Sequence, residues 1–523
     1  MSRRVVLGLG FASLVACGGG DLAAPPPASP ASAPSASVAP PAPSADVGPL
    51  PSEPPAPRET PAFQPPTPTV FKAANGMTVW LVERHALPIV SIRIAVPAGS
   101  SSDPKGEAGL AFQAAGMLDE GAGALGALDF AQAVNQLGAT FATDATLDIS
   151  YAQLGVMKRD LAAGMKLLGD AVVRPRFEAK EWKRVHDLWM NDLKERASDP
   201  VEVARVVEKA VLYGSDHPYG HPVDGLLASA PKVTLAEAKR FYTQAWRPDR
   251  AVLVAVGDLT REELDAQITA AFKGWKTPAT PPLPVVTPPP PVGPGKTRLI
   301  FVERPDAPQA VIQVARAGVA VDDPRYAPLD RANLVVGGTF TSRINTDLRE
   351  KRGWTYGAFS SVSKSRGVGT VTAGGAFVTE HAVEALKALL GDLDDFAHGG
   401  MSEAEAAKTK VQARAELVSA YETIQKTAQT LGMDAALGLS PDWEAKSSAA
   451  ADAVDRDALV KLATPFYPSD GTTIVIVGSR AKLEDDLRKT GVAPIESYDA
   501  EGNPATSAPS KASEPSEPKE KKK

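Results

Sequence analysis

The chain has 523 residues and a formal net charge of −6, with acidic and basic side chains interspersed along it. No basic stripe or aromatic-plus-basic cluster is present, so the composition excludes nucleic acid as a partner. The single cysteine, Cys17, rules out an internal disulfide and a cysteine-based metal cluster.

The N-terminus has the organisation of a bacterial secretory signal. Arginines at 3 and 4 precede an apolar run at 5–16, which is too short to span a bilayer. The letters LVAC, ending at Cys17, resemble a lipobox, so we expect residues 1–17 to be a lipoprotein signal peptide with Cys17 as the lipidated residue. Gly18 favours the outer membrane of the cell envelope, facing the periplasm. A plain signal peptide with an incidental cysteine is the alternative.

A spacer and then a strand pair follow. Residues 18–66 are dominated by Pro, Ala and Ser, a composition that predicts an extended linker between membrane and folded part. Asn75-Gly76 lies between two apolar runs and indicates a hairpin. The alternation of Val90, Ile92, Ile94 and Val96 predicts a half-buried strand.

Residues 109–118 read GLAFQAAGML. This segment resembles the active-site segment of the pitrilysin/insulinase-type zinc metallopeptidases, in which HxxEH on a helix supplies two zinc-binding imidazoles and a general-base glutamate. Phe112, Ala115 and Gly116 stand in those three places, and their side chains can neither bind zinc nor accept a proton. We therefore expect a retained helix without its chemistry. Taken alone, ten residues do not exclude an ordinary Ala-rich core helix.

The other candidate metal ligands are incomplete. The resemblance places a third ligand, a glutamate, in the window 189–193, which holds Asp192 but no glutamate. His217 and His221 are four apart in HPYGHP, but the proline and glycine between them predict a loop, and the resemblance implies a structural role for HPYG. We predict no metal site in this chain.

An internal duplication divides the chain into two similar parts. Val82-Glu83-Arg84 recurs as Val302-Glu303-Arg304, and a strand-like run ending in Val-Gly closes each part, at 251–258 and 472–479. The spacing is about 220 residues throughout. Helical apolar spacing recurs at 161–172 and 383–393. We predict two α+β domains, each a mixed or antiparallel sheet covered on one face by helices, at 67–277 and 298–492, with a Pro-rich linker at 278–297 and a disordered tail at 493–523.

The second informative stretch is GGTFTSRINTDLREKRGWTYG at 337–357. Apolar spacing and Gly353 predict a helix that ends near Arg352, followed by a strand from about Trp354. This stretch resembles the C-terminal-domain signature of the same family, in which an Arg and a Tyr seven residues apart bind the substrate backbone near the scissile bond. Arg349 and Tyr356 match that pair, and both are donors suited to a carbonyl oxygen or an oxyanion. A solvated helix arginine and a half-buried strand tyrosine are the plainer interpretation.

The resemblance covers about 430 residues, with one motif erased and one intact. The resemblance implies paired domains that form a half-clamshell. The pattern of motifs resembles the non-zinc subunit of the bacterial two-chain members of the family. We therefore expect a chain that is inactive alone and contributes chamber wall, Arg349 and Tyr356. A homologous HxxEH-containing partner would supply zinc, general base and water, and the substrates would be peptides or small unfolded proteins. The alternative is a non-enzymatic peptide-binding or scaffold lipoprotein of the cell envelope.

The anchor can be tested directly. If Cys17 is lipidated, the full chain should partition with membranes into detergent, because two or more acyl chains give stable attachment. Cys17→Ser should release the protein or block its processing, as followed by cell fractionation and blotting. Recovery of a soluble wild-type protein that lacks Cys17 would contradict the assignment.

Overall fold

A computed structural model describes residues 63–291, 295–305 and 307–505. The predicted signal peptide, Cys17 and most of the spacer therefore lie outside the described residues, as does the end of the chain from 506. Within the described part, no helix combines the length and hydropathy that a membrane crossing requires.

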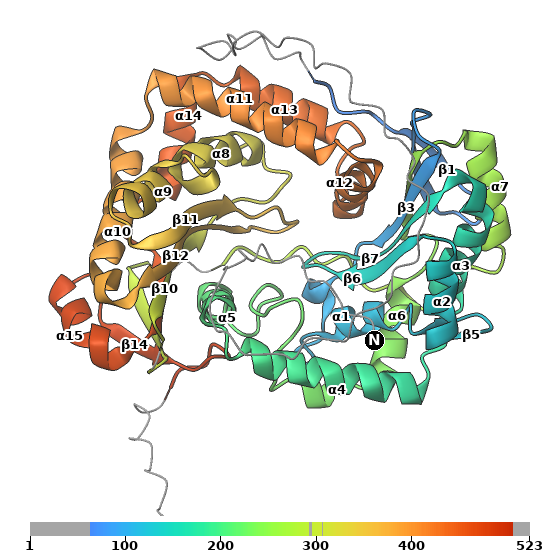
Figure 1. Cartoon of the computed structure of the whole chain (residues 1–523), viewed down its shortest axis with the longest axis horizontal. Coiled ribbons are helices and arrows are strands. Elements are labelled where there is room, and N and C mark those ends of the chain that lie inside the picture. The colour runs from blue at the N-terminus through green and yellow to red at the C-terminus, as the bar shows by residue number, and fades with distance from the viewer. Residues whose placement is uncertain (1–62, 292–294, 306, 506–523) are drawn as a thin grey trace, which may run out of the picture. The chain divides into compact units, whose positions relative to one another are not determined.

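The first half is a six-stranded mixed sheet with helices (Figure 1). The strand order is β1-β2-β8-β3-β7-β6, with only β2 and β8 parallel. The strands are β1 (Thr69–Lys72), β2 (Thr78–Glu83), β3 (Ile89–Val96), β6 (Thr140–Ala145), β7 (Ser150–Met157) and β8 (Val252–Gly257), and β4 (Gly121–Ala122) pairs with β5 (Leu125–Gly126). The helices are α1 (Leu110–Gly116), α2 (Ala127–Gln136), α3 (Leu161–Val173), α4 (Ala179–Arg196), α5 (Pro200–Tyr213), α6 (Leu235–Ala245) and α7 (Arg261–Ala271), with 3-10 turns η1 (Ser100–Ser102), η2 (Lys158–Asp160) and η3 (Ala230–Lys232).

The second half repeats this plan. Its sheet has the order β11-β12-β10-β13-β9-β14 and contains β9 (Arg298–Glu303), β10 (Gln309–Ala317), β11 (Thr355–Val362), β12 (Thr370–Val378), β13 (Thr473–Gly478) and β14 (Ile495–Tyr498). Its helices are α8 (Tyr326–Asn333), α9 (Arg343–Asn345), α10 (Ala382–Gly399), α11 (Glu403–Ala420), α12 (Ile424–Leu437), α13 (Trp443–Ala453), α14 (Arg456–Ala463) and α15 (Arg480–Thr490). Two π-helical turns, η4 (Leu334–Gly338) and η5 (Thr346–Lys351), and two 3-10 turns, η6 (Thr379–His381) and η7 (Thr464–Phe466), complete it.

The topology confirms the predicted duplication. Strands β2, β8, β3, β7 and β6 correspond in order and direction to β9, β13, β10, β12 and β11. The repeated sequence landmarks are pairing partners in the sheets: Glu83 lies opposite Gly257, and Glu303 lies opposite Gly478. The predicted hairpin at Asn75-Gly76 joins β1 to β2, and Gly76 takes the positive φ of 92° that such a turn requires.

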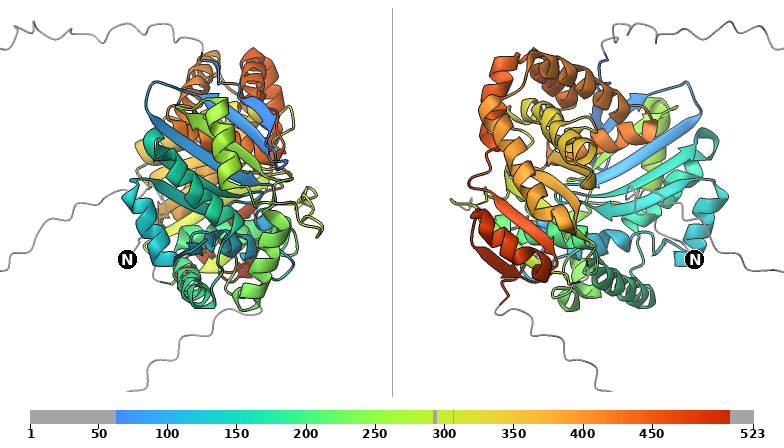
Figure 2. Two further views of the ribbon diagram at one scale, coloured as in Figure 1. Left: turned by 90° about the vertical axis from the view of Figure 1, so that its right-hand side faces the viewer. Right: turned by 60° about the vertical axis from the view of Figure 1, so that its left-hand side comes forward.

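Equivalent helices of the two halves are exchanged. Helix α5 packs on β10 and β13 of the second sheet, whereas α12 packs on β3 and β8 of the first (Figure 1; a second direction of view is given in Figure 2). Val203, Ala204 and Val207 of α5 lie in one apolar cluster with strand residues of the second sheet. Ile424, Ala428 and Leu431 of α12 lie in another with Trp80 and Val254 of the first. The described residues of both halves therefore form one compact unit rather than two separate ones.

Two arginines at equivalent positions of the two halves bond the segments that precede the exchanged helices. The Arg84 guanidinium donates to the carbonyl oxygen of Tyr421 at 3.1 Å, shortly before α12 begins. Arg304, its counterpart, donates to the carbonyl oxygen of Ala197, shortly before α5 begins. Each half thus bonds the segment that leads into the helix contributed by the other half. The sequence pattern alone did not assign this role to the two arginines.

Strand β3 corrects one expectation. It is buried on both faces rather than half-buried, because α12 covers its outer side. There Arg93 is only 2% exposed and lies 3.5 Å from the centre of the Tyr151 ring. Gly432 of α12 permits this approach, since an added Cβ would lie 2.6 Å from Arg93 Cδ. Burial lowers the pKa of Arg93 to about 10.

The boundary at 492 is also wrong. Residues 495–498 form β14, which pairs in parallel with β9, and the described part of the chain continues to 505. Arg298 holds this segment through a bidentate pair with Glu496, at 2.9 and 2.6 Å, and a bond to the Tyr498 hydroxyl. Because these contacts are distant in sequence, the polar composition of the segment suggested disorder instead.

Because α12 covers the first sheet, a substitution in this helix should lower the stability of both halves. Leu431→Ala removes a buried side chain between α12 and the first sheet, and it should lower the free energy of unfolding by about 2–5 kcal/mol. Urea denaturation followed by circular dichroism should show a single transition, because the lost contact joins both halves. The control, Leu188→Ala on the exposed side of α4, should change stability by less than about 0.5 kcal/mol. A wild-type-like Leu431→Ala, or separate transitions of the halves, would refute the interdependence.

Candidate functional site

Helix α1, which carries the segment at 109–118, is held at its start by tight packing. Gly109 has a φ of 96°, and an added Cβ would lie 2.6 Å from the Trp189 ring. The Asp103 carboxylate accepts bonds from the Gly109 and Ala111 amides, both at 2.8 Å. Burial raises the pKa of Asp103 well above its ordinary value. The retained glycine therefore has a structural purpose at this helix start.

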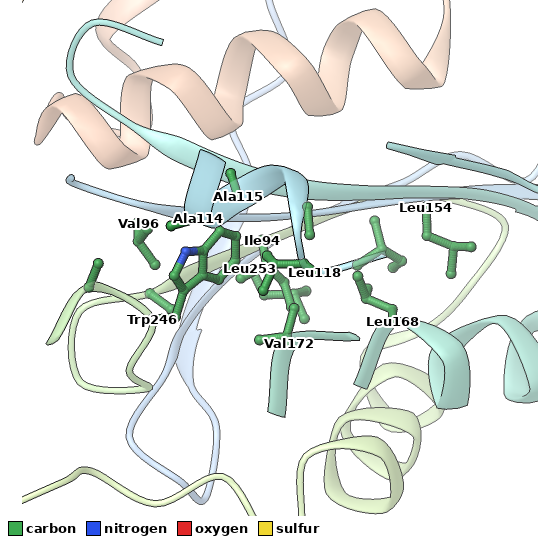
Figure 3. Close-up of a cluster of buried hydrophobic side chains, with 14 of the residues drawn as sticks. Ile94, Val96, Ala114, Ala115, Leu118, Leu154, Leu168, Val172, Trp246 and Leu253 are labelled. Carbon is green, nitrogen blue, oxygen red and sulfur yellow. The ribbon is translucent and has the colours of Figure 1, made fainter. Parts of the chain in front are cut away.

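The three positions of the erased motif have become part of the core. Ala115 is completely buried, Gly116 is buried, and Phe112 is half-buried against the same apolar cluster. Figure 3 shows Ala114 and Ala115 among apolar side chains that include Ile94 and Trp246. The segment is thus a core helix whose three motif positions carry no side chain that could bind a metal or transfer a proton.

Residues 189–193, where a third zinc ligand would be expected, also place apolar side chains towards the core. Leu193 of α4 is buried in the cluster that contains Ala111 and Ala115, whereas Asp192 beside it is exposed. Residues 63–291, 295–305 and 307–505 contain no group of three His, Cys, Asp or Glu side chains that could hold a metal ion. The residues present therefore do not fit the zinc ion of the zinc metallopeptidases that the sequence resembles.

The HPYGHP loop links the two halves instead of binding metal. His217 stacks on Tyr213 and bonds the Pro289 carbonyl at 2.9 Å, while His221 is buried beside the Pro222 carbonyl, and burial lowers its pKa. The buried Tyr219 hydroxyl donates to the Asp148 carboxylate at 2.8 Å and accepts from the Gly367 amide at 2.9 Å. The Arg366 amide also donates to Asp148.

Arg349 and Tyr356 lie on neighbouring elements of the second half. Arg349 is in the π-helical turn η5, which ends near Arg352 as predicted, and Gly353 follows with a φ of 68°. Its guanidinium pairs with Glu350 and lies 4.4 Å from the centre of the Phe340 ring. Pairing and stacking leave further N–H groups for a ligand, since a guanidinium has five.

Tyr356 is turned outward by an irregularity in β11. The register against β12 shifts between Thr355 and Ala358, which is the position of a β-bulge, and Tyr356 is 88% exposed. Phe359, 49% exposed, folds its ring over Gly357. Within the described chain no hydrogen bond or ring contact joins Tyr356 to Arg349. The structure thus places the two donors on adjacent elements without direct contact.

The outer edge of β11 is partly closed by side chains. Asn345 Oδ1 accepts from the Ala358 amide at 3.1 Å, and Asn333 Nδ2 donates to the Ser360 carbonyl at 3.1 Å. These bonds occupy backbone groups that a further strand would need. A ligand at this edge would therefore meet the exposed side chains rather than a free strand edge. Phe340 lies within the 337–357 signature and Phe359 just after it, but nothing in the sequence pattern marks either ring as part of the site.

Comparison with known proteins agrees with this geometry. Residues 78–212 match the family profile described as insulinase, peptidase family M16, and residues 232–412 match the one described as peptidase M16 inactive domain. Together the two matches span more than half of the chain. The profiles thus cover both the half with the erased motif and the stretch that contains Arg349 and Tyr356.

Individual relatives are similar over most of their length or over one part. A Mycobacterium bovis protein named as an uncharacterized zinc protease is 26% identical over 361 residues, 68% of this chain and 81% of the relative. A Helicobacter pylori protein named as a non-peptidase homolog is 27% identical over 177 residues, 34% of this chain and 41% of the relative. The crystal structure of a peptidase M16 inactive domain from Pseudomonas fluorescens superposes with a TM-score of 0.72 at 26% identity, covering 79% of this chain and 98% of that one.

The metal prediction follows from the apolar site. The purified chain should hold less than stoichiometric zinc after dialysis, as measured by elemental mass spectrometry, and it should cleave no peptide. Restoring the site would take Phe112→His, Ala115→Glu and Gly116→His together with a third ligand. That ligand would have to replace the buried Leu193, because Asp192 is exposed. Such a variant should bind zinc weakly, because the surrounding hydrogen-bond partners are missing. Tightly bound zinc in the wild-type chain, removed by chelator together with peptidase activity, would overturn the prediction.

Proposed function

Because the chain belongs to the insulinase family of peptidases, M16, we propose that it is the non-zinc subunit of a secreted, zinc-dependent peptidase. The observation that carries the proposal is a contrast within one chain. The helix of the first half keeps its shape without any metal-binding or proton-transferring side chain. The second half keeps Arg349 and an outward-turned Tyr356 on adjacent elements. A chain built in this way binds substrate but needs a partner for the chemistry.

In the proposed complex, Arg349 and Tyr356 hold the carbonyl oxygen of the peptide bond that is cleaved. Both are hydrogen-bond donors, and a charged guanidinium bonds more strongly as negative charge develops on that oxygen. Stacking on Phe340 keeps the Arg349 head in one orientation before substrate arrives. The bulge at Tyr356 directs its hydroxyl to solvent instead of into the sheet.

The partner would be a homologous chain with an intact HxxEH motif, which supplies the zinc ion, general base and water that this chain lacks. Substrates would be peptides or small unfolded proteins, since the closed chamber that two such chains form would exclude folded ones. We propose that Cys17 anchors the complex at the outer membrane, facing the periplasm. Affinity purification of the tagged full chain from its native cell should recover such a partner.

A non-enzymatic role is the second candidate. One similar protein is named a non-peptidase homolog, and an erased metal site is compatible with a peptide-binding or scaffold lipoprotein of the envelope. The absence of any HxxEH homologue from the purified material and from the genome would favour this role.

The Arg/Tyr assignment predicts a kinetic effect in the complex with the partner. Tyr356→Phe deletes one exposed hydroxyl and keeps the ring, so the packing of β11 should be unchanged. Because an interaction made only in the transition state affects turnover, kcat should fall on the order of a hundredfold while KM changes little. Arg349→Ala should act in the same direction, and the double variant should lose less than the product of the single losses if both donors serve one oxygen.

The matched control is Tyr498→Phe, which removes a tyrosine hydroxyl from β14 at the opposite edge of the same sheet. It should turn over peptides at the wild-type rate. Partner binding, measured by analytical ultracentrifugation, should be the same for both variants. Wild-type turnover by a properly assembled Tyr356→Phe complex would refute the catalytic role.

A further inference from the structure

A polar cavity of about 320 Å³ lies within the second half, beside the turn that carries Arg349. Its walls come from η4, α9, η5, α10 and α11. Thr346, Asp347 and Lys351 of η5 line it, whereas Arg349 of the same turn stacks on Phe340 outside it. The volume is at the small end of ligand-binding pockets and is far larger than a single water needs.

Two polar atoms of the wall are buried and have no hydrogen-bond partner. Ser342 is 2% exposed, and its Oγ makes no bond, although the residue directly precedes α9 and could have capped it. Asp392 Oδ2, from α10, is also buried without a partner. Buried polar groups in folded proteins are almost always hydrogen-bonded, so this pair calls for an explanation.

The charged groups of the wall form salt bridges except for one carboxyl group and one ammonium group. Arg343 makes a bidentate pair with Glu405, at 2.8 Å for both contacts, and Arg352 pairs with Asp347 at 2.7 Å. In the part of the chain that the structure describes, no salt bridge joins Asp392 to a cation. Burial together with Asp347 and Asp395 raises the pKa of Asp392 to about 7, against the opposing influence of Arg352 and Lys351.

The unpaired cation is Lys408 of α11. Its ammonium group donates to the Thr341 hydroxyl at 2.6 Å and approaches the Thr341 carbonyl at 3.4 Å, and no carboxylate of the described chain pairs with it. A carboxyl group without a cation and an ammonium group without an anion thus line one small cavity. Such a pair is complementary to a ligand that carries both charges.

We propose that this cavity binds a small zwitterion, a free amino acid or a dipeptide. Its ammonium group would bond Asp392 and the Ser342 hydroxyl, and its carboxylate would bond Lys408. The inference goes beyond the proposed function, because binding requires neither a partner chain nor a catalytic role for Arg349. Ligands of this class are also the end products of peptide hydrolysis, and η5 connects the cavity to Arg349.

Titration calorimetry of the full chain with dialanine tests the proposal. Dialanine should bind at millimolar or lower concentration, whereas N-acetyl-dialanine and dialanine amide, which each lack one charge, should bind roughly tenfold more weakly or not at all. Asp392→Asn should weaken dialanine binding by at least about tenfold, and Ser342→Ala should weaken it less, because the serine bond is uncharged.

The matched control is Asp485→Asn, an exposed position of α15 that does not line the cavity. It should bind dialanine like the wild type. Circular dichroism and thermal melting confirm that each variant is folded, and Ser342→Ala provides a second, smaller perturbation. The proposal is overturned if dialanine does not bind the folded wild-type chain at about 10 mM. It is equally overturned if folded Asp392→Asn binds as tightly as Asp485→Asn.

Discussion

The two halves are joined by the reciprocal exchange of helices α5 and α12. Each sheet needs cover on both faces, and each obtains the second cover from the other half. Arg84 and Arg304, the repeated arginines, hold the entries of the exchanged helices, and Asp148 joins the halves through Tyr219 and the Arg366 amide. The helix with the erased motif and the edge with Tyr356 therefore belong to one compact unit.

Loss of the metal motif fits this dependence. Without a metal, two imidazoles and a carboxylate at positions 112, 115 and 116 would put polar groups into or beside an apolar cluster, which is unfavourable unless they find partners. Phe112, Ala115 and Gly116 remove that cost and keep α1 packed in the core of the first half. The fold can thus persist without metal-binding residues in its first half. The two donors of the second half, the half-buried Arg349 and the exposed Tyr356, contribute little to the core.

Much of the fold could be predicted from local patterns. The repeated Val-Glu-Arg and Val-Gly ends gave the duplication because they mark paired strand ends, and Gly353 marked the end of the η5 turn. The predictions that failed depend on contacts between residues that are far apart in the sequence. Alternation in β3 could not reveal that α12 covers its outer face, and the polar segment 495–498 gave no sign of its bonds to Arg298. The π-helical turn and the bulge at Tyr356 likewise depend on tertiary packing, as does the inward position of Leu193 beside the exposed Asp192.

Hydrolysis of a fluorogenic peptide tests whether substrate binding and zinc chemistry are divided between two chains. The rate would be measured for this chain alone, for an HxxEH-bearing homologue from the same cell alone, and for their equimolar mixture. The account predicts that the mixture is active and that this chain alone is not, with the homologue alone far slower than the mixture. Hydrolysis by this chain alone, or a mixture no faster than the homologue, would contradict it.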